Sequence, residues 1–138
     1  MAEFIMKDLV KKAGLEQEFM IDSRATSTEE TGNPIHRGTM GIFKKYQISC
    51  TGHRAQQMSR QDYETYDYLI GMDQSNIRNM TRIAGGDPEK KIYKMMEFTG
   101  SGRDVADPWY TGDFEATYRD VSEGCQALLE KLKGNLAR

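Results

Sequence analysis

The 138 residues include only two cysteines and three prolines, and each scarcity excludes a class of protein. Cys50 and Cys125 lie far apart and match no metal-binding spacing, so no metal site is expected. Two cysteines also exclude a disulfide-rich scaffold, and both are expected to be free thiols in or near the core. With so few prolines, neither a Pro-rich linker nor a low-complexity segment is expected.

Long hydrophobic runs and an excess of one charge are also missing. No apolar run approaches the roughly 20 residues of a membrane span, and no charged-then-apolar signal segment opens the chain. The net charge of −2 gives no electrostatic reason to expect nucleic acid or an anionic membrane as the main partner. These absences together predict a protein of the cytoplasm.

The residues that are present have the composition of an ordinary globular protein, with 38% hydrophobic and 29% charged residues. This length predicts a single domain over residues 1–138. Helices are expected over residues 2–13, from 36 or 37 to 46, over 74–83 and over 114–132, and strands over 19–25, 66–72 and 92–98. Strands separated by helices predict an α/β fold, a three-layer sandwich with a parallel sheet.

This pattern is one strand short. It begins with a helix, whereas doubly wound domains open with a strand that feeds the first helix. Such a strand is central in the sheet, and its carboxyl end carries the anion-binding loop at the helix N-terminus. We therefore expect the first strand of the domain to be missing from these residues.

Two polar residues follow the strand expected at 66–72. A metal or phosphate contact at Asp73 and Ser75 is one interpretation, because both lie at a strand end. We favour a helix cap for Ser75 and a turn role for Asp73.

The loop before the last helix carries the most distinctive motif, Asp107-Pro108-Trp109-Tyr110. Pro108 fixes its own φ and favours an extended conformation of Asp107, so the carboxylate projects from a stiff turn. An acid held beside two aromatic rings can donate a proton to a leaving group in an aromatic-walled pocket. Asp-Pro also starts ordinary turns, so the motif alone leaves both interpretations open.

Five segments, in order and at similar spacing, resemble the low-molecular-weight protein tyrosine phosphatases. They are Met1-Ala2-Glu3, Ile21-Asp22-Ser23, Gly52-His53-Arg54-Ala55, residues 67–73 with Ser75-Asn76, and Asp107-Pro108-Trp109-Tyr110. The resemblance implies the phosphotyrosine protein phosphatase I-like fold. It also implies hydrolysis of a phosphotyrosine protein or a small aryl phosphate through a cysteinyl-phosphate intermediate, without a cofactor. The related arsenate reductases add redox cysteines that are absent here.

The resemblance also assigns roles to residues. Asp107 is implied to be the general acid that protonates the phenol oxygen and then the base that activates water. Trp109 and Tyr110 are implied to form the wall of the substrate pocket. Ser23 and His53 are implied to hydrogen-bond toward the nucleophile loop and to hold its backbone donors in place.

That nucleophile loop, a Cys and an Arg separated by five residues and followed by Ser-Pro, is not in the sequence. After Cys50 an arginine comes too early, at Arg54, and Cys125 lies inside the final helix. We therefore expect no nucleophile and no activity from these residues alone. An internal start, a truncation, or a natural relic without catalysis would each explain the absence.

A second function follows from the same absence. A chain without a nucleophile is interpreted alternatively as a non-catalytic phosphotyrosine-binding or self-associating module. Because a missing central strand leaves unpaired sheet edges, the sequence also predicts a homodimer or a strand-exchanged assembly.

Overall fold

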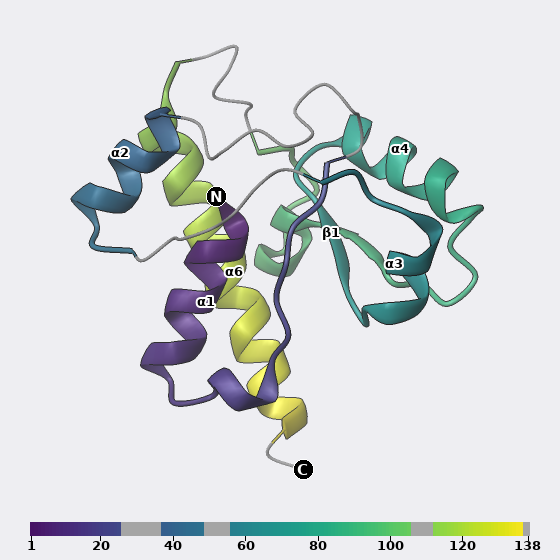
Figure 1. The fold of residues 1–138 in the computed structure, drawn as a ribbon, viewed down its shortest axis with the longest axis horizontal. Coiled ribbons are helices and arrows are strands. Elements are labelled where there is room, and N and C mark those ends of the chain that lie inside the picture. Colours follow the sequence, from purple (N-terminus) through teal and green to yellow (C-terminus); the bar gives the residue numbers. More distant parts are fainter. Residues whose placement is uncertain (26–36, 49–55, 106–111, 137–138) are drawn as a thin grey trace.

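The computed structural model describes residues 1–25, 37–48, 56–105 and 112–136, and places helices on both sides of a small parallel sheet (Figure 1). The elements are α1 (Ala2–Lys12), the 3-10 helix η1 (Glu16–Glu18), α2 (Arg37–Lys45), α3 (Arg60–Thr65), β1 (Leu69–Gly71), α4 (Gln74–Ala84), β2 (Ile92–Lys94), the 3-10 helix η2 (Met95–Thr99) and α6 (Phe114–Leu136). The predicted α/β class is thereby confirmed, and within the described ranges no helix has the length and apolar character needed to cross a bilayer.

The sheet is shorter than the sequence predicted. β1 pairs in parallel with β2, with Ile70 opposite Tyr93. Of the strand expected at 19–25, only Ala25 forms a bridge, a parallel one to Gln57. The segment is extended at Phe19 but has no ladder partner among the described residues before Ala25.

The strand expected at 92–98 is also wrong beyond its first half. It ends at Lys94, whose backbone N–H donates to the Glu97 carboxylate at 3.0 Å. With its N–H bound to a side chain, Lys94 ends the strand, and the chain turns into η2. This 3-10 helix buries Met95 and Met96. Gly100, with a φ of +87°, ends the turn in the left-handed region.

Helix starts are set by acidic caps that the sequence analysis did not assign. The Asp73 carboxylate accepts the Asn76 N–H at 2.7 Å and caps α4, whereas Ser75 lies inside the helix. The cap expected at Ser75 is therefore wrong, because a cap must precede the first helical turn. The sequence analysis missed α3 altogether, although Ser59 and Asp62 form its capping box.

Two hydrophobic clusters enclose the sheet, one on each face. The α1–α6 cluster contains, as buried residues, Phe4, Ile5, Met6, Val10, Phe43, Ile48, Met95, Met96, Val105, Val121, Cys125, Leu128 and Leu129. The smaller α3–α4 cluster contains Met58, Tyr63, Leu69, Met80 and Ala84. Along β1, Leu69 packs into the α3–α4 cluster while Ile70 packs against the α1–α6 cluster, so the strand is apolar on both sides.

Helix α2 packs against the first turns of α6 and is bound to them by polar contacts. The Tyr46 ring stacks on Tyr118 with the centroids 4.1 Å apart. The Tyr46 hydroxyl donates to Glu115 at 2.8 Å, and Lys45 forms an ion pair with the same carboxylate. The Glu115 pKa is lowered from its ordinary value by these hydrogen bonds from Lys45 and Tyr46. The start of α6 is therefore positioned by α2.

A glycine allows this close packing, which leads to a first prediction. A Cβ at Gly38 would lie 2.4 Å from the Phe114 ring, whereas a Cβ at Gly41 would meet nothing within 4 Å. We expect Gly38→Ala to be less stable than Gly41→Ala by about 1–3 kcal/mol, because only the first forces the ring out of place. Both substitutions gain similar helix propensity, about 1 kcal/mol. Urea unfolding of the two variants measures the difference, and equal midpoints would contradict the assigned contact.

Candidate active site

The carboxyl end of β1 is the place where a parallel sheet usually carries its functional residues. Just beyond β1, the Met72 carbonyl accepts the N–H of Val105 at 2.8 Å. Asp104, next to Val105, accepts from the Gln74 N–H at 3.1 Å and forms an ion pair with Lys94 at 2.9 Å. The connection after η2 is thereby fixed to this edge of the sheet.

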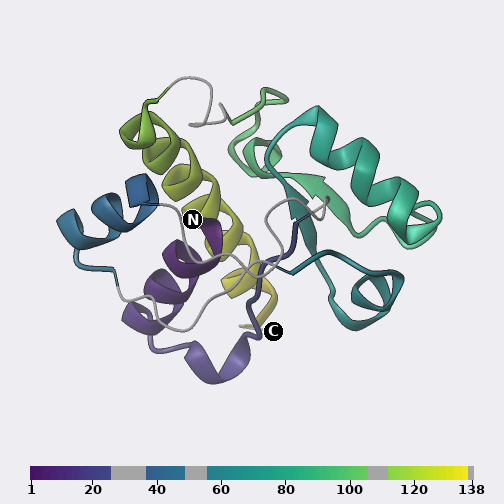
Figure 2. The ribbon, with the colours of Figure 1, turned by 45° about the horizontal axis from the view of Figure 1, so that its top comes forward.

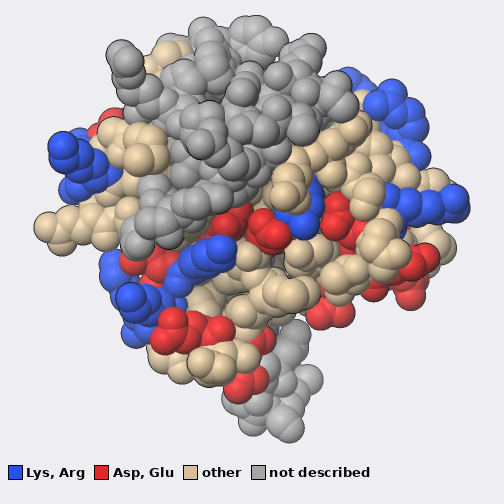
Figure 3. Space-filling model, viewed as in Figure 1, with Lys and Arg blue, Asp and Glu red and all other residues tan. Residues whose placement is uncertain are grey.

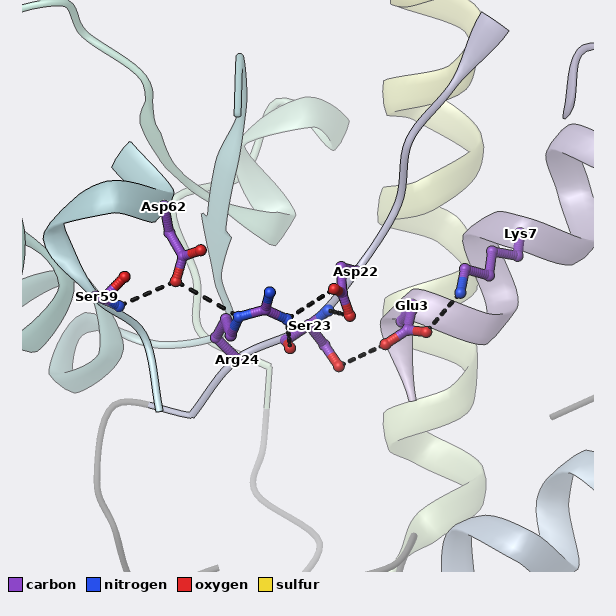
Figure 4. Close-up of polar contacts among 7 residues, drawn as sticks. All are labelled: Glu3, Lys7, Asp22, Ser23, Arg24, Ser59 and Asp62. Carbon is purple, nitrogen blue, oxygen red and sulfur yellow. Dashed lines mark hydrogen bonds and ion pairs between the residues drawn. The ribbon is translucent and has the colours of Figure 1, made fainter. Parts of the chain in front are cut away.

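Ser23 lies against the first turn of α1. Its hydroxyl donates to Glu3 Oε1 at 2.7 Å, and Lys7 donates to Glu3 Oε2 at 2.7 Å (Figure 4). The Glu3 side chain is only 4% exposed. A carboxylate in the first turn of a helix also interacts favourably with the helix dipole. Because a serine hydroxyl has a single proton, Ser23 can act toward the rest of the site only as an acceptor.

Arg24 continues this polar contact toward α3. Its guanidinium lies 2.8 Å from the Asp22 carboxylate and 3.5 Å from Asp62 (Figure 4). Burial favours protonated Asp22, but hydrogen bonds from Arg24 and from the Ser23 N–H outweigh it and lower the Asp22 pKa. Since Asp62 belongs to the capping box of α3, the residues around Ser23 join α1 to the other side of the sheet.

Both flanks of residues 106–111 are anchored. Val105 on one side is 3% exposed and hydrogen-bonded to Met72. On the other side, Phe114 packs on Gly38 and Glu115 binds the end of α2. The chain before this segment therefore lies at the carboxyl end of β1, and the chain after it lies at the start of α6, beside α2 (Figure 2).

The sequence matches the family model described as low molecular weight phosphotyrosine protein phosphatase over residues 1–138. The chain belongs to this family. It is 37% identical over 135 residues to the low molecular weight protein-tyrosine-phosphatase YfkJ of Bacillus subtilis, covering 96% of this chain and 86% of that protein. It is 35% identical over 137 residues to the rat low molecular weight phosphotyrosine protein phosphatase, covering 94% of this chain and 85% of the rat protein.

Solved structures agree with this membership. The crystal structure of YfkJ matches with a TM-score of 0.93 at 36% identity, covering 97% of this chain and 86% of that one. The structure of SP-PTP, the low molecular weight protein tyrosine phosphatase of Streptococcus pyogenes, gives a TM-score of 0.84 at 45% identity, covering 95% of this chain and 82% of that one. By family, the protein is a protein-tyrosine-phosphatase, a phosphoric monoester hydrolase.

Most site residues that the sequence indicated for this phosphatase domain lie outside the described residues. These are Asp107, Trp109, Tyr110 and His53. Their roles stay predictions. Of the predicted set, Ser23 is described, and the structure places it beside Glu3 at the N-terminus of α1.

Of the two cysteines, Cys50 lies outside the described residues, and Cys125 has no features of a nucleophile. Cys125 is 1% exposed inside α6, and burial raises the pKa of its thiol to about 12. A neutral buried thiol is unreactive, since the thiolate is the nucleophile. The expectation that Cys125 is a free thiol in the core is confirmed. The described ranges also contain no group of three or more His, Cys, Asp or Glu side chains that could hold a metal ion.

Glu3 is the residue that sequence analysis missed. Met1-Ala2-Glu3 was noted for its resemblance alone, and a glutamate in a first helical turn is usually an exposed dipole partner. The amphipathic pattern of α1 could have indicated that Glu3 is buried, because Glu3 lies on the same buried side of the helix as Phe4 and Ile5. Its partner Ser23, twenty positions away, is not visible in that pattern.

The pair gives a second prediction. We expect a double-mutant cycle of Glu3→Ala and Ser23→Ala to give a coupling energy of about 1.5–3 kcal/mol, the range for hydrogen bonds to buried charged groups. The more exposed pair of Asp8 and Lys12 on the same helix is the control, with an expected coupling of about 0.3–0.5 kcal/mol. Chemical unfolding of the wild type and the six variants measures both couplings, and equal values would show that burial adds nothing to the Glu3–Ser23 contact.

Proposed function

We propose that the protein hydrolyses phosphotyrosine monoesters, and that these 138 residues supply the acid, the pocket wall and supporting groups but no nucleophile. Family membership supports the reaction class. The anchoring of the described residues on both sides of 106–111 carries the proposal, because Val105, two residues before Asp107 in the sequence, is held at the carboxyl end of β1. That is the edge where an anion site is expected in this fold class.

In the proposed reaction, a cysteine thiolate takes the phosphoryl group and Asp107 protonates the departing phenol oxygen. Asp107 then acts as the base for the water that hydrolyses the cysteinyl phosphate. Trp109 and Tyr110 stack on the flat phenyl ring of the substrate. Ser23 and His53 hold the backbone donors of the nucleophile loop, with Ser23 accepting hydrogen bonds because its proton is given to Glu3.

The same mechanism explains why these residues alone are proposed to be inactive. Transfer to cysteine needs a thiolate in a ring of backbone N–H groups with an arginine, and one such donor contributes about 3–4 kcal/mol. The sequence contains no Cys-x5-Arg, and Cys125 remains a buried neutral thiol. The alternative is a non-catalytic phosphotyrosine-binding or self-associating module.

Hydrolysis of p-nitrophenyl phosphate tests the proposal. The 138-residue chain is compared with a version extended at its N-terminus by a strand and a Cys-x5-Arg-Ser-Pro loop of the family pattern. Activity in the extended version alone supports the proposal. Activity in the 138-residue chain would show that these residues do contain a nucleophile, against the proposal. No activity in either version would favour the non-catalytic binding module.

Partners other than the substrate also remain proposals. In the described part of the face shown in Figure 3, lysine and arginine side chains are interspersed with aspartate and glutamate, so that part presents no purely positive surface to a polyanion. We expect a homodimer or strand-exchanged assembly where a sheet edge is unpaired, and a cytoplasmic location. Sedimentation equilibrium of the 138-residue chain tests the assembly, and a clean monomer at all concentrations would rule it out.

A further inference from the structure

Ser23 is held by side chains at each of its polar groups. Its N–H donates to Asp22 Oδ1 at 2.8 Å, its carbonyl accepts from Arg24 Nη1 at 2.8 Å, and its hydroxyl donates to Glu3 Oε1 at 2.7 Å (Figure 4). The contacts from Asp22 and Arg24 fix the backbone of the residue, and the contact with Glu3 fixes its side chain. The direction of the hydroxyl therefore depends on where the neighbouring residues hold the backbone.

Arg24 connects this backbone to α3. Its Nη1 also lies 2.8 Å from Asp22 Oδ2, and its Nε lies 3.5 Å from Asp62 Oδ2 (Figure 4). The same oxygen of Asp62 accepts the Ser59 N–H at 3.0 Å. The guanidinium therefore joins the Ser23 carbonyl to the capped start of α3.

The residue after Arg24 is fixed to the same part of the chain. The Ala25 N–H donates to the Gln56 carbonyl, and the Ala25 carbonyl accepts from the Met58 N–H, both at 2.7 Å. Met58 directly precedes the Ser59 cap of α3. Arg24 is thus bound to the segment that starts α3 through its side chain and, one residue later, through the backbone.

The contacts of Arg24 depend on the shape of the guanidinium as well as on its charge. Nη1 serves a carbonyl oxygen and a carboxylate oxygen, while Nε faces a second carboxylate. A lysine ammonium is a point charge on a flexible stem and does not present donors in this fixed fork. Arg24→Lys therefore keeps the positive charge and removes the geometry.

We propose that Arg24 is a positioning residue of the candidate active site, which rests on the supporting role proposed for Ser23. By holding the Ser23 carbonyl, Arg24 keeps the Ser23 hydroxyl directed at Glu3, so that its oxygen accepts hydrogen bonds from the nucleophile loop. When that geometry is lost the hydroxyl turns, and the loop donors that stabilise the cysteine thiolate lose a fixed acceptor. Arg24 acts on the reaction only through Ser23.

The orientation of Ser23 is tested in the 138-residue chain without any activity. The Glu3–Ser23 double-mutant cycle is measured by chemical unfolding in the native background and again with Arg24→Lys. We expect the coupling, expressed as a ratio of unfolding equilibrium constants, to fall at least about threefold with Arg24→Lys, because the hydroxyl no longer meets Glu3 in a fixed direction. Arg78 is exposed on α4, and Arg78→Lys is the matched control that should leave the coupling unchanged.

Two results would overturn the positioning role. The first is an unchanged Glu3–Ser23 coupling with Arg24→Lys. The second is an equal fall with Arg78→Lys, since the effect would then not come from the contacts of Arg24.

The effect on the chemistry is measured in the N-terminally extended version. Alkylation of the loop cysteine by iodoacetate across pH, followed by mass spectrometry of its peptide, reports the pKa of that thiol. We expect Arg24→Lys to shift this profile to higher pH and to lower kcat/KM for p-nitrophenyl phosphate about tenfold, whereas Arg78→Lys should change neither. A merely structural role of Arg24 would lower stability and leave the alkylation profile in place.

The two measurements separate this role from the proposed function. An extended version that hydrolyses no substrate would contradict the proposed reaction, while the coupling and the alkylation profile would still decide the role of Arg24. An active extended version in which Arg24→Lys reduces the coupling but leaves the alkylation profile unchanged would show that Ser23 does not support the nucleophile loop. That result would overturn the effect of Arg24 on the reaction.

Discussion

Replacing Asp107 by alanine in the N-terminally extended version is expected to lower kcat/KM for phosphotyrosine peptides by about 10²–10⁴-fold, the usual contribution of a general acid. The expected loss in kcat/KM is smaller for p-nitrophenyl phosphate, because p-nitrophenolate leaves readily without a proton. The kcat should fall for both substrates, because Asp107 is also proposed to activate the water that hydrolyses the shared cysteinyl phosphate. Steady-state kinetics with both substrates measures this difference.

The control for this experiment is Asp67→Ala, which removes an exposed carboxylate just before β1. It should leave kcat unchanged for both substrates. If Asp107→Ala lowered kcat/KM for the two substrates by the same factor, proton donation to the leaving group would be the wrong role. If it raised KM alone, Asp107 would belong to substrate binding.

Replacing Phe43 by alanine is expected to destabilise the fold by about 3–5 kcal/mol, the range for removing a large buried aromatic side chain. Phe43 is 1% exposed and lies edge-to-face with Phe4, with the ring centroids 5.7 Å apart. The substitution would leave a cavity between α1 and α2 that the α1–α6 cluster cannot fill by small shifts. Urea unfolding measures the loss.

The matched control is Lys44→Ala, the next residue of α2, whose side chain is exposed. It changes the same helix without opening a cavity, and we expect a change within about 0.5 kcal/mol. A Phe43→Ala loss below about 1 kcal/mol would show that α2 does not depend on this contact with α1.

Local sequence patterns predicted a helix or strand correctly where its structure depends on its own residues rather than on distant ones. The amphipathic periods of α1 and α6 and the apolar run at β1 placed these elements within a few residues. Gly85, with a φ of +78°, ends α4 within two residues of the end predicted at residue 83. In these places the side-chain pattern and the backbone preference agree, so no distant residue changes the outcome.

The predicted strand end and helix cap were wrong where a side chain binds a backbone N–H that the prediction had assigned to another partner. Glu97 captures the N–H of Lys94 and turns the expected strand into η2. Asp73 rather than Ser75 captures the first donors of α4. Aspartate and serine are comparable caps, so only the position of the first helical turn decides between them.

By itself, the sequence determined the α/β class, the family and the absence of a Cys-x5-Arg loop, because these depend on residue types and their order. Only the tertiary structure decided that Ser23 donates its proton to a buried Glu3, and that Asp104 accepts the Gln74 N–H at the start of α4. A hydrogen-bond partner twenty or thirty positions away is fixed by how packed helices and strands meet. Such contacts depend on distances in space, which the order of residues does not contain.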